Sequence, residues 1–207
     1  MEVQTIHISK MSGKLDGLRA ISTNTVSNDF CQKMYNSGNG NNICTKCYSN
    51  KMLRTYRKNT QPALQRNSDL LSQSVDDAVL KATRIMDAFL RLNAHGELIN
   101  EQHLSNLVRL AELKPYTSFT LWTKRKNIVR KYFDNHEKPK NLILIYSNPR
   151  ISSIMDSPPE YFDKTFNNVL EHESVDQQNC TGQKCADCLL CYTKNDVKTI
   201  VEKVKKY

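Results

Sequence analysis

The sequence lacks any long apolar segment. Its N-terminal stretch, MEVQTIHISKMSGKLDG, contains no apolar signal segment, and no run elsewhere approaches the roughly 18 apolar residues of a membrane-spanning helix. We therefore expect a cytoplasmic protein that does not enter a membrane. In that reducing compartment, clustered cysteines are metal ligands or redox groups more often than disulfides.

Internal repeats are also absent from the sequence, whose 207 residues are 39% hydrophobic. A chain of this length and composition suits one domain with a real core, so disorder is not expected. We expect an α/β body over residues 1–175 that includes an N-terminal cysteine loop at 31–47. A C-terminal cysteine cluster and a docking helix, over 176–207, are expected to belong to the same domain.

The charge balance is basic, with a net charge of +9 and a pI near 9.2. Such a balance indicates attraction to an anionic partner, such as nucleic acid or an acidic protein surface. The basic residues of KRKNIVRK and KTIVEKVKKY do not alternate with aromatic residues, and a charge run on a helix is usually a solvated face. Nucleic-acid binding is therefore an alternative interpretation and not the leading one.

Cysteine is the residue that the sequence concentrates. Four thiols within CTGQKCADCLLC are a density that metal coordination requires and core packing does not. The front group comprises Cys31, Cys44 and Cys47, and the rear group comprises Cys180, Cys185, Cys188 and Cys191.

The seven cysteines divide into three and four, which gives each group a chemical role. Three thiolates leave one position of a metal centre open for water or substrate, whereas four close it. The repeated C-x-x-C steps at the rear are the ferredoxin manner of wrapping a 4Fe-4S cluster, so we favour iron and sulfide over zinc. Zinc in the rear group, or one cluster that draws ligands from both groups, stays open as an alternative.

Short apolar runs alternate with amphipathic stretches, which is typical of an α/β fold. In the clearest helix, at 101–113, Leu104, Leu107 and Val108 fall on one face and Asn100 is placed to cap the start. The sequence predicts strands at 18–22, 88–92, 118–122 and 142–146, and further helices at 67–86 and 124–134.

A final helix is predicted at 194–206. Val197, Ile200, Val201 and Val204 have the i, i+3, i+4, i+7 spacing of one helix face, and Thr193 is placed to cap the start. We expect this helix to dock the rear cysteine loop onto the body of the protein.

The order of these motifs resembles two related groups of proteins. A three-cysteine loop after the first strand, followed by LRLNAHGEL at 90–98, resembles the radical S-adenosylmethionine enzymes. The phage-encoded gene product 88 family is closer still. It is similar in its spaced cysteines ending in Cys47-Tyr48, in the segment from Arg91 to the Gly96-Glu97 pair, and in its C-terminal cysteine cluster.

The resemblance implies a partial (β/α) barrel, or an open and mostly parallel sheet flanked by helices, with a C-terminal cysteine-rich metal loop. It implies one or two 4Fe-4S clusters, an electron donor, and S-adenosylmethionine bound at the front cluster in the cytoplasm of a bacterial host. Gly96 and Glu97 would contact the amino group of that cofactor, and Arg91 or Asn93 its carboxylate or ribose.

No catalytic residue is assigned by these observations. The alternative to a redox protein is a metal-stabilised basic protein, with zinc or a structural cluster, that binds nucleic acid or a host protein. An open metal position would distinguish the redox protein from the metal-stabilised binding protein, because an interaction module needs only closed, structural sites.

Overall fold

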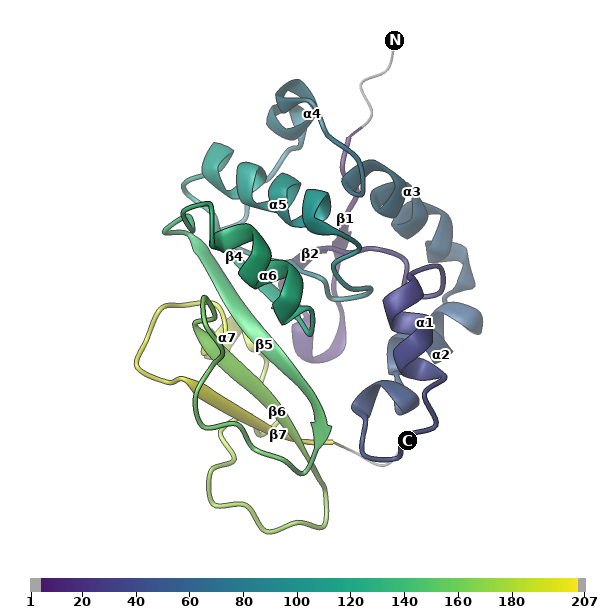
Figure 1. Cartoon of the computed structure of the whole chain (residues 1–207), viewed down its shortest axis with the longest axis vertical. Coiled ribbons are helices and arrows are strands. Elements are labelled where there is room, and N and C mark those ends of the chain that lie inside the picture. Colours follow the sequence, from purple (N-terminus) through teal and green to yellow (C-terminus); the bar gives the residue numbers. More distant parts are fainter. Residues whose placement is uncertain (1–4, 205–207) are drawn as a thin grey trace.

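The computed structural model describes residues 5–204. Seven strands within this range form a single sheet, and helices lie in several of the connections between them (Figure 1). The strands lie in the sheet in the order in which they occur along the chain, with β1 and β7 at the two edges. β1 pairs antiparallel with β2, and every pair from β2 to β7 is parallel. The strands are β1 (Ile8–Lys10), β2 (Arg19–Ile21), β3 (Phe89–Leu92), β4 (Ser118–Thr123), β5 (Leu142–Ile151), β6 (Lys164–Leu170) and β7 (Thr199–Val204).

Helices lie in the connections from β2 to β3, β3 to β4 and β4 to β5, whereas no helix lies among the described residues between β5 and β6, and only α7 lies between β6 and β7. Right-handed crossovers between neighbouring parallel strands place their helices on one face of the sheet. Figure 1 shows α5 and α6 side by side next to β4 and β5, whereas residues of α7 pack with Ile143 and Ile145 on the other face. The helices are α1 (Asp29–Tyr35), α2 (Tyr48–Arg54), α3 (Gln61–Leu71), α4 (Asp77–Ala82), α5 (Glu101–Leu113), α6 (Lys126–Phe133) and α7 (Cys185–Cys188).

Alternate residues of the central strand β5 enter two different hydrophobic clusters. Leu142 and Leu144 pack with the helices on one face, whereas Ile143 and Ile145 pack with the C-terminal segment around Tyr192 on the other. A strand covered on both faces reads as a continuous apolar run, which is why LILIY was predictable. The mixed α/β architecture with a mostly parallel sheet is therefore confirmed.

The four predicted strands correspond to β2, β3, β4 and β5, and the helices at 101–113 and 124–134 to α5 and α6. Asn100 caps α5, since its side chain accepts a hydrogen bond from the backbone N of His103 at 2.8 Å. Among residues 5–204, no helix is both long and apolar enough to cross a bilayer.

The single helix predicted at 67–86 is wrong, because the chain forms α3 and α4 there with a turn between them. Asn106 of α5 fixes this turn. Its side-chain amide donates to the carbonyls of Leu71 and Gln73 at 2.9 and 2.7 Å, so the backbone leaves the helical path. Asp76 then caps α4 by accepting from the backbone N of Ala78 at 2.7 Å.

The final helix predicted at 194–206 is also wrong, because residues 199–204 form strand β7; residues 205 and 206 lie outside the described part of the chain. Six residues of β7 pair in register with β6, from Thr165 with Thr199 to Leu170 with Val204. The β-branched Ile and Val residues suit a strand, and pairing gives β6 partners for its backbone groups. Short-range spacing could not reveal that partner strand.

Candidate functional site

The front cysteines lie in the segment that follows β2. Two asparagines shape it: Asn28 caps α1 by accepting from the backbone N of Cys31, and Asn42 accepts from that of Cys44, both at 3.0 Å. Burial raises the pKa of the Cys31 and Cys44 thiols, and the neighbouring Cys47 sulfur adds to the effect on both. The three thiols are thus close enough to influence one another's ionisation.

The rear cysteines lie in the segment between β6 and β7, which crosses the sheet face opposite the large helices. Polar side chains on that face bind its carbonyls. The hydroxyl of Ser118 donates to Tyr192 O at 2.9 Å, and the ammonium of Lys164 donates to Leu190 O at the same distance. The segment is therefore held against β4 and β6 by side chains that point away from the helices.

The four rear thiols surround a small cavity of about 20 Å³. Cys185 and Cys188 lie on α7, after which Leu189 adopts a left-handed conformation, with φ of 50°, and turns the chain. Burial raises the pKa of Cys191 to about 12 and also raises those of Cys180 and Cys185.

Both cysteine groups face one larger cavity of about 440 Å³ between the front segment and the sheet. The residues predicted from the LRLNAHGEL segment line the same cavity. Of all the predicted metal and cofactor residues, only Cys188 is missing from its lining, and that residue lines the small cavity instead. The larger cavity is lined by Cys31, Cys44, Cys47, Cys180, Cys185, Cys191, Arg91, Asn93, Gly96 and Glu97, among others.

Glu97 is buried and its carboxylate already has three donors. Oε1 accepts from the hydroxyl of Thr123 at 2.5 Å and from the backbone N of Leu98 at 2.8 Å. Oε2 accepts from the backbone N of Lys124 at 2.8 Å. The carboxylate thus ties the end of β3 to the end of β4 and keeps one acceptor position on Oε2 for a further partner.

Lys124 places a cation beside the front thiols. Burial lowers its pKa, but the nearby Cys44 and Glu97 outweigh that effect, and the pKa is raised overall. Its ammonium also donates at 2.9 Å to the hydroxyl of Ser147, which lies within β5 just beyond the residues that pair with β4. Residues that follow β3 and β4 therefore meet a residue of β5 at this rim, and sites at the carboxyl ends of strands are the general rule for parallel sheets.

Arg91 is a second cation in the cavity, and its guanidinium lies 4.0 Å from the centre of the Trp122 ring. Its Nε is buried and has no hydrogen-bond partner among residues 5–204. Arg91 is thus held by an aromatic face and has donor capacity to spare. The neighbouring Asn93, just after β3, adopts a left-handed conformation with φ of 59°.

Gly96 has a structural reason to be glycine. It adopts φ of 79°, and a Cβ at this position would lie 2.1 Å from Oγ1 of Thr23. The glycine therefore allows close packing of the β3 end on the β2 end, whatever the cavity holds.

Several residues of the site were not found from the sequence. The hydroxyl oxygen of Ser49 lies 2.7 Å from the hydroxyl oxygen of Thr25 and 2.9 Å from Nδ1 of His95, within hydrogen-bond distance of both. Burial and the nearby Arg91 lower the pKa of His95 to about 4, so its ring is neutral at physiological pH. Lys14 reaches the rear group from the N-terminal hairpin. His95 lies within the LRLNAHGEL segment, but no local motif marks Ser49, Thr25 or Lys14, because distant segments bring them together.

The arrangement of the cysteine side chains bears on which metal they could bind, zinc or an iron-sulfur cluster. Across residues 5–204, no three His, Cys, Asp or Glu side chains converge closely enough to hold a single metal ion. A single zinc ion needs sulfurs that converge within bonding distance of one point, about 2.3 Å from each. A four-iron cluster binds each thiolate at a separate corner, so a cluster does not require the sulfurs to converge on one point.

Comparison with known proteins gives one relationship. Searches of curated proteins and of solved structures found no match to this chain. The model of one protein family, described as Gene product 88, matches residues 9–179, which include the front cysteines, the LRLNAHGEL segment and most of the sheet. The chain therefore belongs to the Gene product 88 family.

Proposed function

We propose that this chain is an iron-sulfur protein with two centres that face one cavity. Cys31, Cys44 and Cys47 hold the front cluster, and the four rear cysteines hold the second. The observation that carries the proposal is the convergence of both cysteine groups on the same cavity, although they lie near opposite ends of the chain.

The charges around the cavity support thiolate-ligated clusters. Among residues 5–204, its lining includes the cations Lys14, Lys46, Arg91 and Lys124 but only two carboxylates, those of Glu97 and Glu202. A cluster with cysteine ligands is negative overall, because the thiolates bring more negative charge than the iron-sulfide core brings positive. Buried negative charge requires such neighbouring cations.

The two centres have different roles because they have different numbers of ligands. Bound clusters supply one-electron transfer, and the front one, with three thiolates, has an iron that is free to bind a ligand. Arg91, Asn93 and the neutral ring of His95 line the cavity and can bind and orient that ligand. An electron donor outside this chain is required.

We further propose S-adenosylmethionine as the ligand of the front centre and a partial barrel as the shape of the sheet. The parallel strands from β2 to β7 follow one another in sequence order, as in a singly wound (β/α) barrel. The spare acceptor position on Oε2 of Glu97 is available for an amino group. These features support the likeness to radical S-adenosylmethionine enzymes.

Cysteine substitution followed by iron analysis tests the proposal. Cys44→Ser should remove about half of the iron from anaerobically purified protein and leave the far-ultraviolet circular dichroism spectrum unchanged, because only the front cluster depends on it. Cys188→Ser should remove the other half. Equal collapse of the fold in both variants, with zinc in the wild type, would contradict the proposal. It would favour a metal-stabilised protein that binds nucleic acid or a host protein.

A further inference from the structure

Lys14 reaches the rear cysteines from a distant part of the chain. It lies in the turn Gly13–Leu15 between β1 and β2 and lines both cavities. The β1–β2 connection packs closely on α7, since a Cβ added to Gly17 would lie 3.2 Å from Cβ of Ala186. The position of Lys14 over the rear group is thus fixed by packing.

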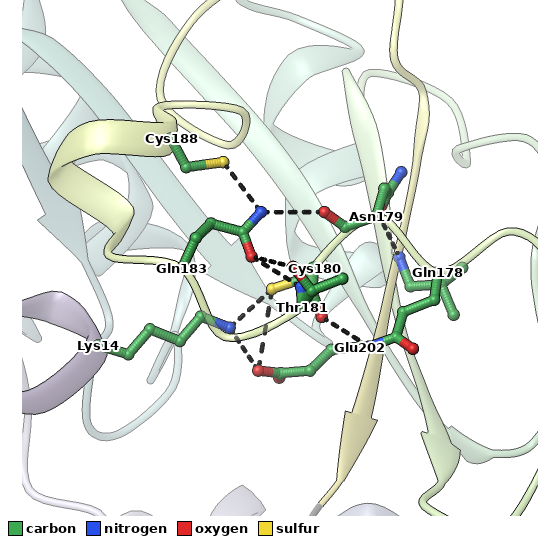
Figure 2. A network of polar contacts seen from close by, with 9 residues as sticks. Lys14, Gln178, Asn179, Cys180, Thr181, Gln183, Cys188 and Glu202 are labelled. Carbon is green, nitrogen blue, oxygen red and sulfur yellow. Dashed lines mark hydrogen bonds and ion pairs between the residues drawn. The ribbon is translucent and has the colours of Figure 1, made fainter.

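The ammonium of Lys14 contacts a thiol directly, as Figure 2 shows. Its Nζ donates to Sγ of Cys180 at 2.7 Å and to Oε1 of Glu202 at 2.5 Å. The Lys14 and Glu202 side chains are each 29% exposed, so water screens their charges only in part. Cys180 is fixed in turn, because its backbone N donates to Val201 O at 3.1 Å.

A second thiol of the rear group has a neutral donor. The side-chain amide of Gln183 donates to Sγ of Cys188 at 3.5 Å and to Asn179 O at 3.1 Å (Figure 2). A hydrogen bond from a charged donor is roughly twice as strong as one between neutral groups. Of these two donors, Lys14 is therefore the one with the larger electrostatic effect on the rear sulfurs.

We propose that Lys14 raises the reduction potential of the rear iron-sulfur cluster through its hydrogen bond to Cys180. This inference rests on the proposed function. Reduction adds one electron from a low-potential donor to the cluster and transfers no atom. An ammonium at a ligand sulfur stabilises the added negative charge, and hydrogen bonds to the sulfurs are among the determinants of cluster potentials.

Glu202 should lower the reduction potential of the rear cluster, which is opposite to the effect of Lys14. Its carboxylate lies beside the same ammonium and within 3.9 Å of the Cys180 sulfur, so it offsets part of the positive charge. The potential of the rear cluster is therefore set by a lysine and a glutamate with opposite effects. Substitution of each should shift the potential in opposite directions.

Redox titration separates these effects from structural ones. Anaerobically purified protein is titrated with dithionite, and the reduced rear cluster is followed by electron paramagnetic resonance. Lys14→Met should shift the midpoint to lower potential, and Glu202→Gln should shift it to higher potential. Lys184→Met is the matched control, because this lysine is 61% exposed and pairs with Asp16 at 3.7 Å. Its charge is screened, so the midpoint should stay at the wild-type value.

The outcomes distinguish this inference from the proposed function. Wild-type protein without iron at the rear cysteines would overturn both. Equal iron content in wild type and Lys14→Met, with equal midpoints, would overturn the role of Lys14 alone. If Lys14→Met loses the rear iron, its midpoint cannot be measured and the Glu202→Gln variant becomes the test. An unchanged or lower midpoint in Glu202→Gln would then overturn the inference.

Discussion

Replacement of Glu97 by glutamine should destabilise the protein, although it changes only one atom of the side chain. The carboxylate accepts from Thr123, Leu98 and Lys124, and each of these donors points at an oxygen. Glutamine must place an NH₂ group against at least one of them. The variant also loses the negative charge beside the ammonium of Lys124.

The magnitude follows from these contacts. Loss of one charge-assisted hydrogen bond costs about 1.5–3 kcal/mol, and a buried donor left without an acceptor costs about 1–3 kcal/mol. Because the two costs overlap, we expect the free energy of unfolding to fall by about 3 kcal/mol. With a urea m-value of about 3 kcal/mol per M, the unfolding midpoint should fall by about 1 M.

Urea unfolding followed by circular dichroism, on anaerobic samples matched for iron content, measures this effect. Glu171→Gln is the control, because Glu171 is exposed in a turn after β6 and should change stability by less than about 0.5 kcal/mol. A Glu97→Gln variant as stable as wild type would refute the reasoning. It would mean that the carboxylate is not committed to the three protein donors and is held for a ligand.

Three further predictions concern other parts of the fold. Burial lowers the pKa of His103 to about 3, so stability should fall as pH falls from about 6.5 toward 4, and urea midpoints for His103→Leu should depend less on pH. Gly96→Ala should lower the midpoint more than Gly38→Ala, because both have positive φ but only Gly96 has atoms within 4 Å of an added Cβ. Lys164→Met removes the bond to Leu190 O and should increase protease cleavage at 178–197, whereas unchanged cleavage would contradict its docking role.

The elements predicted correctly are those whose local signals agree with their environment. The helix at 101–113 has a capping asparagine and a complete apolar face, and LILIY is a strand covered on both sides. The predictions that failed depend on distant residues. Asn106 breaks the helix predicted at 67–86, and β6 recruits residues 199–204 into the sheet.

The candidate site shows the same division. Clustered thiols and the segment from Arg91 to Glu97 could be found from residue type and spacing, and the fold brings them to one cavity. Lys14 and Ser49 could not be found in this way, because neither belongs to a local motif. Their contacts depend on how the β1–β2 hairpin and α2 lie against other parts of the chain.

The most direct test of the two-centre account is the iron and acid-labile sulfide content of anaerobically purified protein, measured with its zinc content and its low-temperature electron paramagnetic resonance spectrum. The account predicts about eight iron and about eight sulfide per chain. About four of each would mean one cluster shared by the two cysteine groups. Zinc alone, in a colourless protein without a resonance after reduction, would contradict the account.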